Sequence, residues 1–344
     1  MSERLQNRIG RVCAPSIVDF LEAEARPPAA DEVRIKIVSS AICGSDLHIY
    51  KGMHPSVPLP ATIGHEFAGD IVDIGSSVSG FKPGDRVTVE PCVTCGVCEA
   101  CLRGEYGYCE KILFIYRAGD GAMADYITVK ASHVYHLPEY LSYDAGALIE
   151  PLSVAIHAVR RADIRMGESV LIIGAGAIGL LTAALCKKSG ADEIAVVDFN
   201  DSRLEMARQM GATTTINPSK GDDVYERVRE LTGGKGVHKS FECVGRQETF
   251  LQAMMSLRKN GLATIVGIFE NPEVTIPATR FITHEIKVQG AQGYCWDFPV
   301  ALSVSREIDL EKLITHVFKL DELQLALDTC LNPAANSIKV ILKP

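Results

Sequence analysis

The sequence lacks the features that would send the protein to a membrane or out of the cell. No apolar run reaches the roughly 20 residues that a membrane-spanning helix needs. The first 30 residues mix arginine, glutamate and aspartate with short apolar stretches, without the continuous apolar core of a secretory signal. We therefore expect a cytoplasmic protein.

An excess of positive charge is also absent. The formal net charge is −8, so the protein is acidic. Nucleic acids and anionic membrane surfaces attract proteins with an excess of positive charge instead. With 47% hydrophobic and 23% charged residues, the composition is that of an ordinary globular protein. The expected partner is a small molecule, and neither a nucleic acid nor a membrane.

No internal repeat or long linker divides the 344 residues, but their pattern changes along the chain. Between 31 and 137, short β-type runs are punctuated by glycine and proline. Between 169 and 291, β-rich runs alternate with helical patterns, which predicts an α/β domain with a doubly wound parallel sheet. The tail ends in the strand-like run 338–342, which could return to the first domain. The chain is long enough for two domains.

A glycine-rich turn follows the strand-like run 170–173 and opens an apolar helix. In this context Gly174 permits the tight turn, and Gly176 lets a pyrophosphate approach the backbone. Gly179 lets the helix pack closely on the strand, and the helix N-terminus supplies N–H groups and a positive dipole. We therefore predict a dinucleotide site here, with Ala177 and Ile178 also in contact.

A carboxylate ends the next strand of this domain. Asp198 follows Gly179 by nineteen residues, where it can accept hydrogen bonds from the adenosine ribose and repel a 2′-phosphate. NAD is therefore the predicted cofactor. Arg203 leaves an alternative open, because its guanidinium could offset that repulsion or pack on the adenine. Three residues after later strands are candidates for cofactor contacts or for sheet packing: Val244, Val266 and Ile268.

Four cysteines fall in one short run, separated by two, two and seven residues: Cys95, Cys98, Cys101 and Cys109. Four thiolates can close a tetrahedral zinc shell that holds a lobe together without reacting. A structural zinc site is the prediction, with Cys92, one step earlier, as a competing ligand or a spare thiol. Disulfides or an iron–sulfur cluster are the alternatives, and the missing secretion signal argues against disulfides.

Two further short motifs carry potential metal ligands: Cys43-Gly44-Ser45-Asp46-Leu47-His48 and Gly64-His65-Glu66. Taken singly, a cysteine or a histidine is more often structural than a ligand. Their combination with the nucleotide motif makes a catalytic metal site a much more specific interpretation.

With these motifs the chain resembles the zinc-containing medium-chain dehydrogenases, and most closely the sorbitol dehydrogenase branch of the polyol dehydrogenases. The resemblance spans nearly the whole length and includes residues 146–154, 294–295 and 298–301. It implies a GroES-like catalytic domain, built from both chain ends, around a Rossmann domain, in a homotetramer or homodimer. The expected boundaries are 1–152 for the catalytic domain with its zinc lobe, 153–291 for the Rossmann domain and 292–344 for the returning segment.

By matching motif, Cys43, His65 and Glu66 are implied to be catalytic zinc ligands. Glu150 is implied to be a fourth ligand or a partner of a zinc-bound water. Zinc would polarise the alcohol oxygen and lower its pKa, so that a carbon-bound hydride passes to the nicotinamide. The resemblance thus implies one catalytic and one structural zinc in each chain.

The proton released by the alcohol needs a path to water. By the same resemblance Ser45 receives it and His48 hands it outward, although His48 also fits a surface or capping histidine. Asp46 is interpreted either as a carboxylate that orients His65 or Cys43, or as a simple turn residue.

The expected reaction converts a secondary alcohol of a polyol or sugar alcohol to a ketone or ketose. Gly293 stands where some sorbitol dehydrogenases carry an arginine, which leaves the substrate open. L-Threonine, butanediol and a sugar-alcohol phosphate are the alternatives, with Arg280 as a candidate phosphate partner. A catalytically silent NAD-binding regulator and a nucleic-acid-binding zinc ribbon are alternatives from other classes. The complete ligand set argues against the regulator, and the acidic charge argues against the zinc ribbon.

Overall fold

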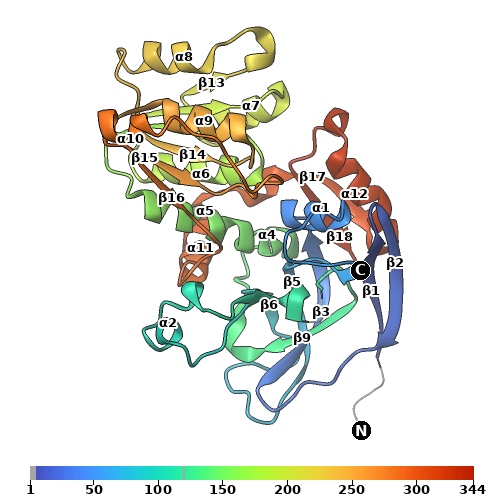
Figure 1. Ribbon diagram of the computed structural model, residues 1–344. Helices are drawn as coiled ribbons and strands as arrows, with labels where there is room; N and C mark the ends of the chain where they lie inside the picture. The colour runs from blue at the N-terminus through green and yellow to red at the C-terminus, as the bar shows by residue number, and fades with distance from the viewer. Residues whose placement is uncertain (1–4, 119–120) are drawn as a thin grey trace. The chain divides into compact units, whose positions relative to one another are not determined.

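The computed structural model describes residues 5–118 and 121–344 and consists of two compact units (Figure 1). One unit comprises Met1–Glu150 with Phe298–Pro344, and the other is Pro151–Asp297. No helix within the described ranges has the length and apolar character needed to cross a bilayer. The boundaries expected at 152/153 and 291/292 stay a prediction.

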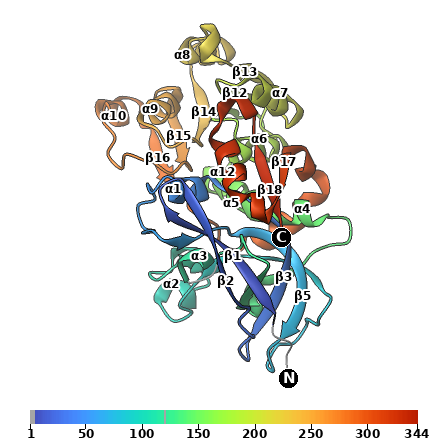
Figure 2. The ribbon, with the colours of Figure 1, turned by 90° about the vertical axis from the view of Figure 1, so that its right-hand side faces the viewer.

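The first unit is built on a seven-stranded and a three-stranded sheet (Figure 2). The larger sheet has the order β10 (Val134–His136), β6 (Arg86–Val89), β5 (Glu66–Ile74), β3 (Glu32–Ala41), β18 (Lys339–Lys343) and β17 (Ile314–Lys319), with β9 (Tyr126–Lys130) also paired to β3. The smaller sheet has the order β2 (Ile17–Glu24), β1 (Gln6–Ala14) and β4 (Ala61–Thr62). Since β17 and β18 come from the end of the chain, the larger sheet joins segments from both ends.

Strand β3 lies between β5 and β18, and its last residue aligns them. Ala41 pairs with Glu66 at the start of β5 and with Ile341 in β18, antiparallel in both cases. Alternate residues of β3, such as Ile35 and Ile37, are buried in the apolar core, as the two-residue period of a strand requires. The register therefore brings the start of β5 and the start of β18 to the same end of the sheet.

Short helices surround these sheets: α1 (Gly44–Tyr50), α2 (Glu99–Leu102), α3 (Ile115–Ala118), α4 (Tyr143–Ala147), α11 (Phe298–Val304) and α12 (Leu323–Leu331). The 3-10 turns of this unit are η1 (Tyr106–Tyr108), η2 (Ala131–His133), η4 (Ser305–Glu307), η5 (Leu310–Leu313), η6 (Leu320–Glu322) and η7 (Pro333–Ala335). Helices α1 and α12 share an apolar core in which Ile49, Met123 and Leu327 are buried. This core fixes α1, whose first turn carries candidate site residues.

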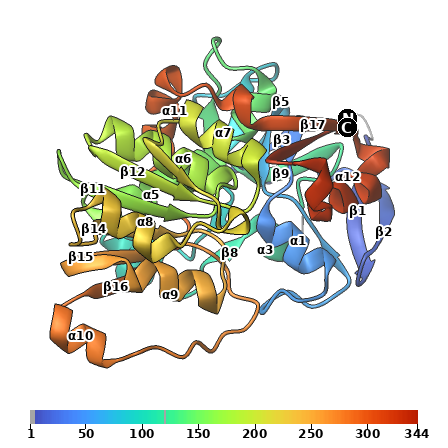
Figure 3. The same cartoon turned by 90° about the horizontal axis from the view of Figure 1, so that it is seen from above.

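The second unit is a six-stranded parallel sheet with helices on both faces (Figure 3). Its order is β13 (Thr214–Ile216), β12 (Glu193–Val197), β11 (Ser169–Ile173), β14 (Val237–Glu242), β15 (Leu257–Ile265) and β16 (Lys287–Gly290). Its helices are α5 (Ile149–Ala162), which begins in the first unit, α6 (Ala177–Lys188), α7 (Asp201–Gln209), α8 (Val224–Leu231), α9 (Gln247–Met255) and α10 (Thr279–His284), with the 3-10 turn η3 (Pro218–Lys220). The chain winds outward from β11 to β13 and then crosses to β14. Ligands bind such sheets at this switch point, beyond the carboxyl ends of the strands.

Candidate zinc and nucleotide sites

Cys43 lies just after β3 and immediately before α1, with an extended backbone (φ −96°, ψ 158°). The Oδ2 atom of Asp46, three residues later, accepts a hydrogen bond of 2.9 Å from the Cys43 backbone N–H. This bond satisfies an N–H group that the first turn of the helix would otherwise leave unpaired. The Cys-Gly-Ser-Asp sequence therefore fixes the position of its own cysteine.

Asp46 also reaches the second ligand segment. Its Oδ1 atom accepts a 2.9 Å hydrogen bond from the Gly64 backbone N–H and lies 3.8 Å from Nδ1 of His65. The Asp46 side chain is fully buried. One carboxylate thus ties the backbone before His65 to the backbone at Cys43, so Asp46 is more than a local turn residue.

The segment between β3 and α1 carries Cys43, His65 lies directly before β5, and Glu66 begins β5. The register of β5 on β3 brings these three residues together. Their ligand atoms all lie within 4.8 Å of one another. His65 and Glu66 are buried, and Nδ1 of His65 has no hydrogen-bond partner among the described residues. A thiolate, an imidazole and a carboxylate are the donor types that zinc takes in catalytic sites. The residues present therefore fit a zinc ion.

The electrostatics of this cluster favour a cation. Burial acts to lower the pKa of His65, but the neighbouring Cys43, Asp46 and Glu150 raise it to about 10. The same three groups, together with burial, raise the pKa of the Tyr116 phenol. The site therefore holds an excess of negative charge that a metal ion would neutralise.

Lys339 belongs to this cluster, and the sequence did not lead us to expect it there. Its Nζ atom donates a 2.6 Å hydrogen bond to Oε1 of Glu66 and a 3.3 Å hydrogen bond to the carbonyl of Ile42. The exposed fractions of the Lys339 and Glu66 side chains are 5% and 1%. The only signal in the sequence was a lysine inside the apolar run 338–342. Lysine is almost never buried unless it is paired.

Aromatic rings line the site around His65. The centroids of Phe114 and Tyr116 lie 5.6 Å and 5.3 Å from that of His65, and His54 contacts Tyr116 edge-on at 6.4 Å. Phe114 ends β8 (Leu113–Phe114), and Tyr116 follows in α3. Sequence reasoning missed all three residues, because nothing in the local pattern shows that they approach His65.

The other three predicted catalytic residues lie around the cluster. Glu150 is buried and close enough for its charge to raise the pKa of His65 and of Lys339, but it is not among the ligand atoms grouped within 4.8 Å. Ser45 is buried, and its Oγ has no hydrogen-bond partner among the described residues. His48 is half-buried and lies three residues further along α1, on the same face.

We expect Asp46→Asn to weaken zinc binding by about 10- to 100-fold, as is typical when a group that orients metal ligands is changed. The amide has one acceptor oxygen in place of two, so the N–H of Cys43 or of Gly64 would lose its partner. Chelator competition at equilibrium measures this affinity. The control is Asp85→Asn, which makes the same change at a turn carboxylate. Asp85 accepts a hydrogen bond from the backbone N–H of Lys82. Equal zinc affinity in the two variants would return Asp46 to a turn role.

The cysteine run forms a lobe between β7 (Cys92–Val93) and β8, which pair antiparallel at its base. The sulfur atoms of Cys95, Cys98, Cys101 and Cys109 all lie within 4.8 Å of one another. The Sγ of Cys95 lies 3.6 Å from that of Cys109 and 4.0 Å from that of Cys101. Zinc–sulfur bonds of about 2.3 Å in a tetrahedron separate the sulfurs by about 3.8 Å. The spacing therefore fits zinc.

The thiols of the lobe suit a metal rather than a disulfide. None of the eleven cysteines, all of which lie within the described residues, forms a disulfide. Backbone N–H groups of Cys101 and Glu110 lower the pKa of Cys98 to about 6, which favours the thiolate that zinc binds, whereas burial raises the pKa of Cys101 to about 12 in the metal-free lobe. Cys92 is buried in β7 and does not belong to the four-sulfur group.

The glycine turn lies at the carboxyl end of β11. Gly174 has φ +98°, a conformation that side chains rarely adopt. A Cβ on Gly179 would lie 1.8 Å from the Gly174 carbonyl oxygen, so the helix can pack here only with glycine. Gly176 has open space at its Cβ position and precedes α6 without any side-chain cap. The turn therefore leaves a helix N-terminus open, as phosphate binding requires. Ala177 and Ile178 are half-buried beside it.

Asp198 follows β12 and supports the turn. Its Oδ2 accepts the Ala175 N–H at 2.8 Å, and its Oδ1 accepts the Asn200 N–H at 2.9 Å. Asn200 in turn caps α7, which carries Arg203. Three further candidate contacts follow β14 and β15: Val244 and Ile268 are exposed and Val266 is half-buried. All of these residues lie at one edge of the sheet, because they follow parallel strands.

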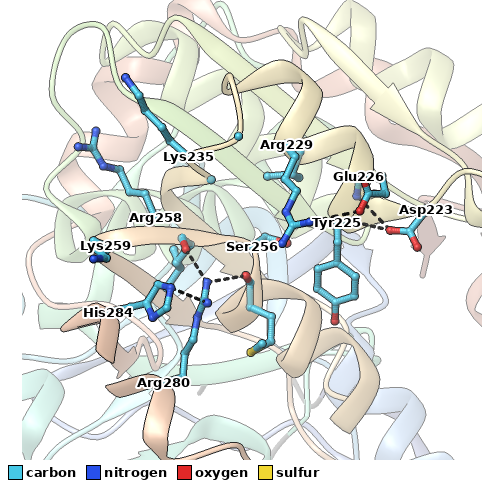
Figure 4. Close-up of a pocket in the computed structure, with 15 residues that line it drawn as sticks. Asp223, Tyr225, Glu226, Arg229, Lys235, Ser256, Arg258, Lys259, Arg280 and His284 are labelled. Atoms are coloured by element: carbon cyan, nitrogen blue, oxygen red, sulfur yellow. Dashed lines mark hydrogen bonds and ion pairs between the residues drawn. The ribbon is translucent and has the colours of Figure 1, made fainter. Parts of the chain in front are cut away.

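Arg280 lies elsewhere in this unit, beside a cavity of about 830 Å³ (Figure 4). That cavity is lined by residues at the amino ends of β14 and β15, opposite to the glycine turn. The guanidinium donates to the carbonyls of Met255 and Leu257 at 3.1 Å and to Nε2 of His284 at 2.8 Å. Arg280 is therefore engaged in holding α10 and does not lie at the nucleotide edge.

Two family models match the chain. Residues 29–139 match the alcohol dehydrogenase GroES-like domain, and residues 177–307 match the zinc-binding dehydrogenase domain. The sorbitol dehydrogenase of Bacillus subtilis is 38% identical over 320 residues, which cover 91% of this chain and 90% of that protein.

Solved structures agree with this assignment. The 2R,3R-butanediol dehydrogenase of Bacillus subtilis is 32% identical, with a TM-score of 0.88 and coverage of 98% of this chain and 99% of the other. A zinc-binding dehydrogenase of Sinorhizobium meliloti, bound to NADP, is 31% identical, with a TM-score of 0.91 and coverage of 99% and 100%. The predicted fold class, the zinc and nicotinamide cofactors and the alcohol dehydrogenase activity are thereby confirmed. The chain belongs to the zinc-containing medium-chain alcohol and polyol dehydrogenase family.

Proposed function

We propose that this enzyme oxidises a secondary alcohol of a polyol or sugar alcohol to the ketone, with NAD as the acceptor. The observation that carries the proposal is the cluster of half-buried Cys43 with buried His65 and Glu66, whose ligand atoms lie within 4.8 Å of one another. The polyol class is supported by 38% identity with a sorbitol dehydrogenase across nine-tenths of both chains.

In this proposal Cys43, His65 and Glu66 hold the catalytic zinc, with Glu150 as a fourth ligand or as the partner of a water on the metal. When bound, zinc supplies a Lewis acid that lowers the pKa of the alcohol oxygen, and NAD supplies the hydride acceptor. Asp46 holds the two ligand segments in register through its bonds to the backbone at Cys43 and at Gly64. The structural zinc is held by the other four ligands: Cys95, Cys98, Cys101 and Cys109.

The protein must also remove the proton of the substrate hydroxyl. Ser45 supports this role because its buried Oγ has no partner among the described side chains and is available to accept that proton. His48 is three residues away on the same face of α1 and half-buried, so it passes the proton on to water. The rings of Phe114 and Tyr116 exclude water from the His65 side of the site.

In this proposal the cofactor binds at the carboxyl-end edge of the parallel sheet, against the turn residues Gly174, Gly176 and Gly179 and against Asp198. The Asp198 carboxylate favours NAD over NADP, because a 2′-phosphate beside it would be repelled. Arg203, on the helix that follows, is the residue able to reduce that preference. The same edge carries the remaining proposed contacts: Ala177, Ile178, Val244, Val266 and Ile268.

We further propose, on the resemblance to the polyol dehydrogenases, a homotetramer or homodimer that works in the cytoplasm. Light scattering on the purified protein determines the number of subunits. The predicted domain division at 152/153 and 291/292 is kept as part of this proposal.

An alcohol panel tests the proposed function. Formation of reduced cofactor is followed by absorbance with sorbitol, xylitol, 2,3-butanediol, L-threonine and galactitol 1-phosphate, each with NAD and with NADP. We expect kcat/KM with a polyol and NAD to exceed each alternative by at least about tenfold, since a site built to bind several hydroxyls loses contacts with shorter alcohols. Zinc-stripped protein is the control. A higher kcat/KM with butanediol, threonine or the phosphate would overturn the polyol assignment, and NAD binding without any turnover would overturn the proposal as a whole.

A further inference from the structure

The cavity beside Arg280 has no part in the proposed reaction. Its volume of about 830 Å³ is typical of small-molecule sites. All of the residues that line it belong to the unit Pro151–Asp297, and they come from α8, α9, α10, the turn before β14 and the start of β15. The glycine turn lies at the opposite ends of these strands, so the cavity is separate from the proposed cofactor edge.

Positive charge is concentrated around this cavity (Figure 4). Five arginine and lysine side chains line it, but only two carboxylates do, in a chain whose formal net charge is −8. The five cations are Arg229, Lys235, Arg258, Lys259 and Arg280. A concave surface lined by charges of one sign raises the local concentration of ions of the opposite sign. The cavity therefore attracts anions, although the protein as a whole is acidic.

The two carboxylates at the cavity do not neutralise these cations. Asp223 caps α8 by accepting backbone N–H groups of its first turn. Glu226 pairs with Arg229 at 3.4 Å, but both side chains are 66% exposed, and exposed pairs of this kind contribute little free energy. Among the residues that the structure describes, no ion pair joins Lys235 or Lys259 to a carboxylate. Several positive charges are thus left without a counter-charge.

Buried polar groups that line the cavity also lack partners. Ser256 is 4% exposed, and its Oγ atom has no hydrogen-bond partner within the described part of the chain. The same holds for Nε of Arg280. Desolvation and the neighbouring Arg229 lower the pKa of Arg280, and desolvation together with Arg280 and Lys259 lowers the pKa of His284. These groups therefore repel one another, and a bound anion would relieve that repulsion and complete the hydrogen bonding.

We propose that this cavity binds a small molecule with two or more phosphate groups, separately from the substrate and the cofactor. Arginine and lysine are the side chains that bind phosphate, the first through its planar fork and the second as a point charge. The cations stand on several elements around a cavity larger than one phosphate, so they match more than one anionic group. Such a ligand holds α8, α10 and the start of β15 together and stabilises the folded state. The proposal does not depend on the catalytic zinc.

Calorimetric titration of the full-length holoenzyme with inorganic pyrophosphate tests the proposal. The enzyme is kept saturated with NADH, because an open glycine turn is itself able to bind a pyrophosphate group. We expect saturable binding and a melting temperature that rises with the pyrophosphate concentration. The double variant Arg229→Met, Lys259→Met should bind at least about tenfold more weakly, because it removes two cations that contact the phosphates.

The matched control is the double variant Lys220→Met, Arg227→Met, which removes the same charge elsewhere in this unit. Arg227 lies on α8 and pairs with Glu230, and Lys220 pairs with Asp201. Neither residue lines the cavity. Its affinity for pyrophosphate should stay within about twofold of the wild type, since exposed charges beyond a Debye length are largely screened.

A second probe distinguishes an organic source of the phosphate groups from an inorganic one. 2,3-Bisphosphoglycerate serves this purpose, since it has no free hydroxyl or ketone on which the enzyme could act. Saturable binding of either probe that is lost in the Arg229→Met, Lys259→Met variant supports the proposal. Three results overturn it: no saturable binding of either probe, equal weakening in the two double variants, or binding of sulfate as tight as that of pyrophosphate. The last two would show attraction by net charge alone.

Discussion

Cys43→Ser will lower kcat/KM for alcohol oxidation by at least about 10³-fold, while NAD affinity stays within about twofold. The substitution replaces a thiolate by a neutral hydroxyl that binds zinc poorly, and a Lewis acid at the alcohol oxygen contributes several kcal/mol to such a reaction. The nucleotide turn is formed by β11, α6 and Asp198, all within Pro151–Asp297, whereas Cys43 lies in the other unit. Loss of the metal ligand therefore leaves the turn intact.

Three measurements together check this result. Steady-state kinetics give kcat/KM, fluorescence titration gives the NAD affinity, and elemental analysis should show a decrease from two zinc ions to one in each chain. Cys13→Ser is the control, because the Cys13 thiol donates a hydrogen bond to the Ile17 carbonyl and belongs to neither cysteine cluster. Unchanged zinc content with full activity in Cys43→Ser would remove Cys43 from the catalytic site.

Cys98→Ser should act on stability first. Four thiolates surround the proposed structural zinc, and its binding energy contributes directly to folding. We expect the free energy of unfolding to decrease by about 3 kcal/mol or more, which lowers the melting temperature by roughly 6–12 °C for a unit of this size. At lower temperature the folded fraction should keep most of its kcat, because none of the lobe cysteines belongs to the Cys43 cluster.

Calorimetry and zinc analysis test this expectation, with Cys92→Ser as the matched control. Cys92 is the cysteine nearest in sequence, is buried in β7 and lies outside the four-sulfur group, so Cys92→Ser should retain both zinc ions. Cys43→Ser should thus lose activity first, whereas Cys98→Ser should lose stability first. Equal loss of folding in Cys43→Ser and Cys98→Ser, or two zinc ions retained in Cys98→Ser, would contradict the division between catalytic and structural metal.

Several features of the molecule are encoded in short stretches of sequence. The glycine turn, the four-cysteine lobe and the Asp46 cap of α1 each depend on residues within about twenty positions of one another. Backbone conformation and loop closure act over such distances, so residue type and spacing predict the glycine turn and the cysteine lobe, whereas for Asp46 they left an orienting carboxylate and a turn residue as alternatives. The class of enzyme and its cofactors follow from these local motifs taken together.

The environment of the metal ligands was decided by the tertiary structure. Asp46 reaches Gly64, the rings of Phe114 and Tyr116 approach His65, and Lys339 pairs with Glu66 across the end of β3. Each contact joins segments that only strand pairing and core packing bring together, and a single sequence does not specify that register. The sequence thus supplied the side chains that we propose bind zinc and nucleotide, whereas the sheet determined which charges face those side chains. The physical reason is that chemistry resides in side-chain type, but electrostatic environment depends on which distant strands become neighbours.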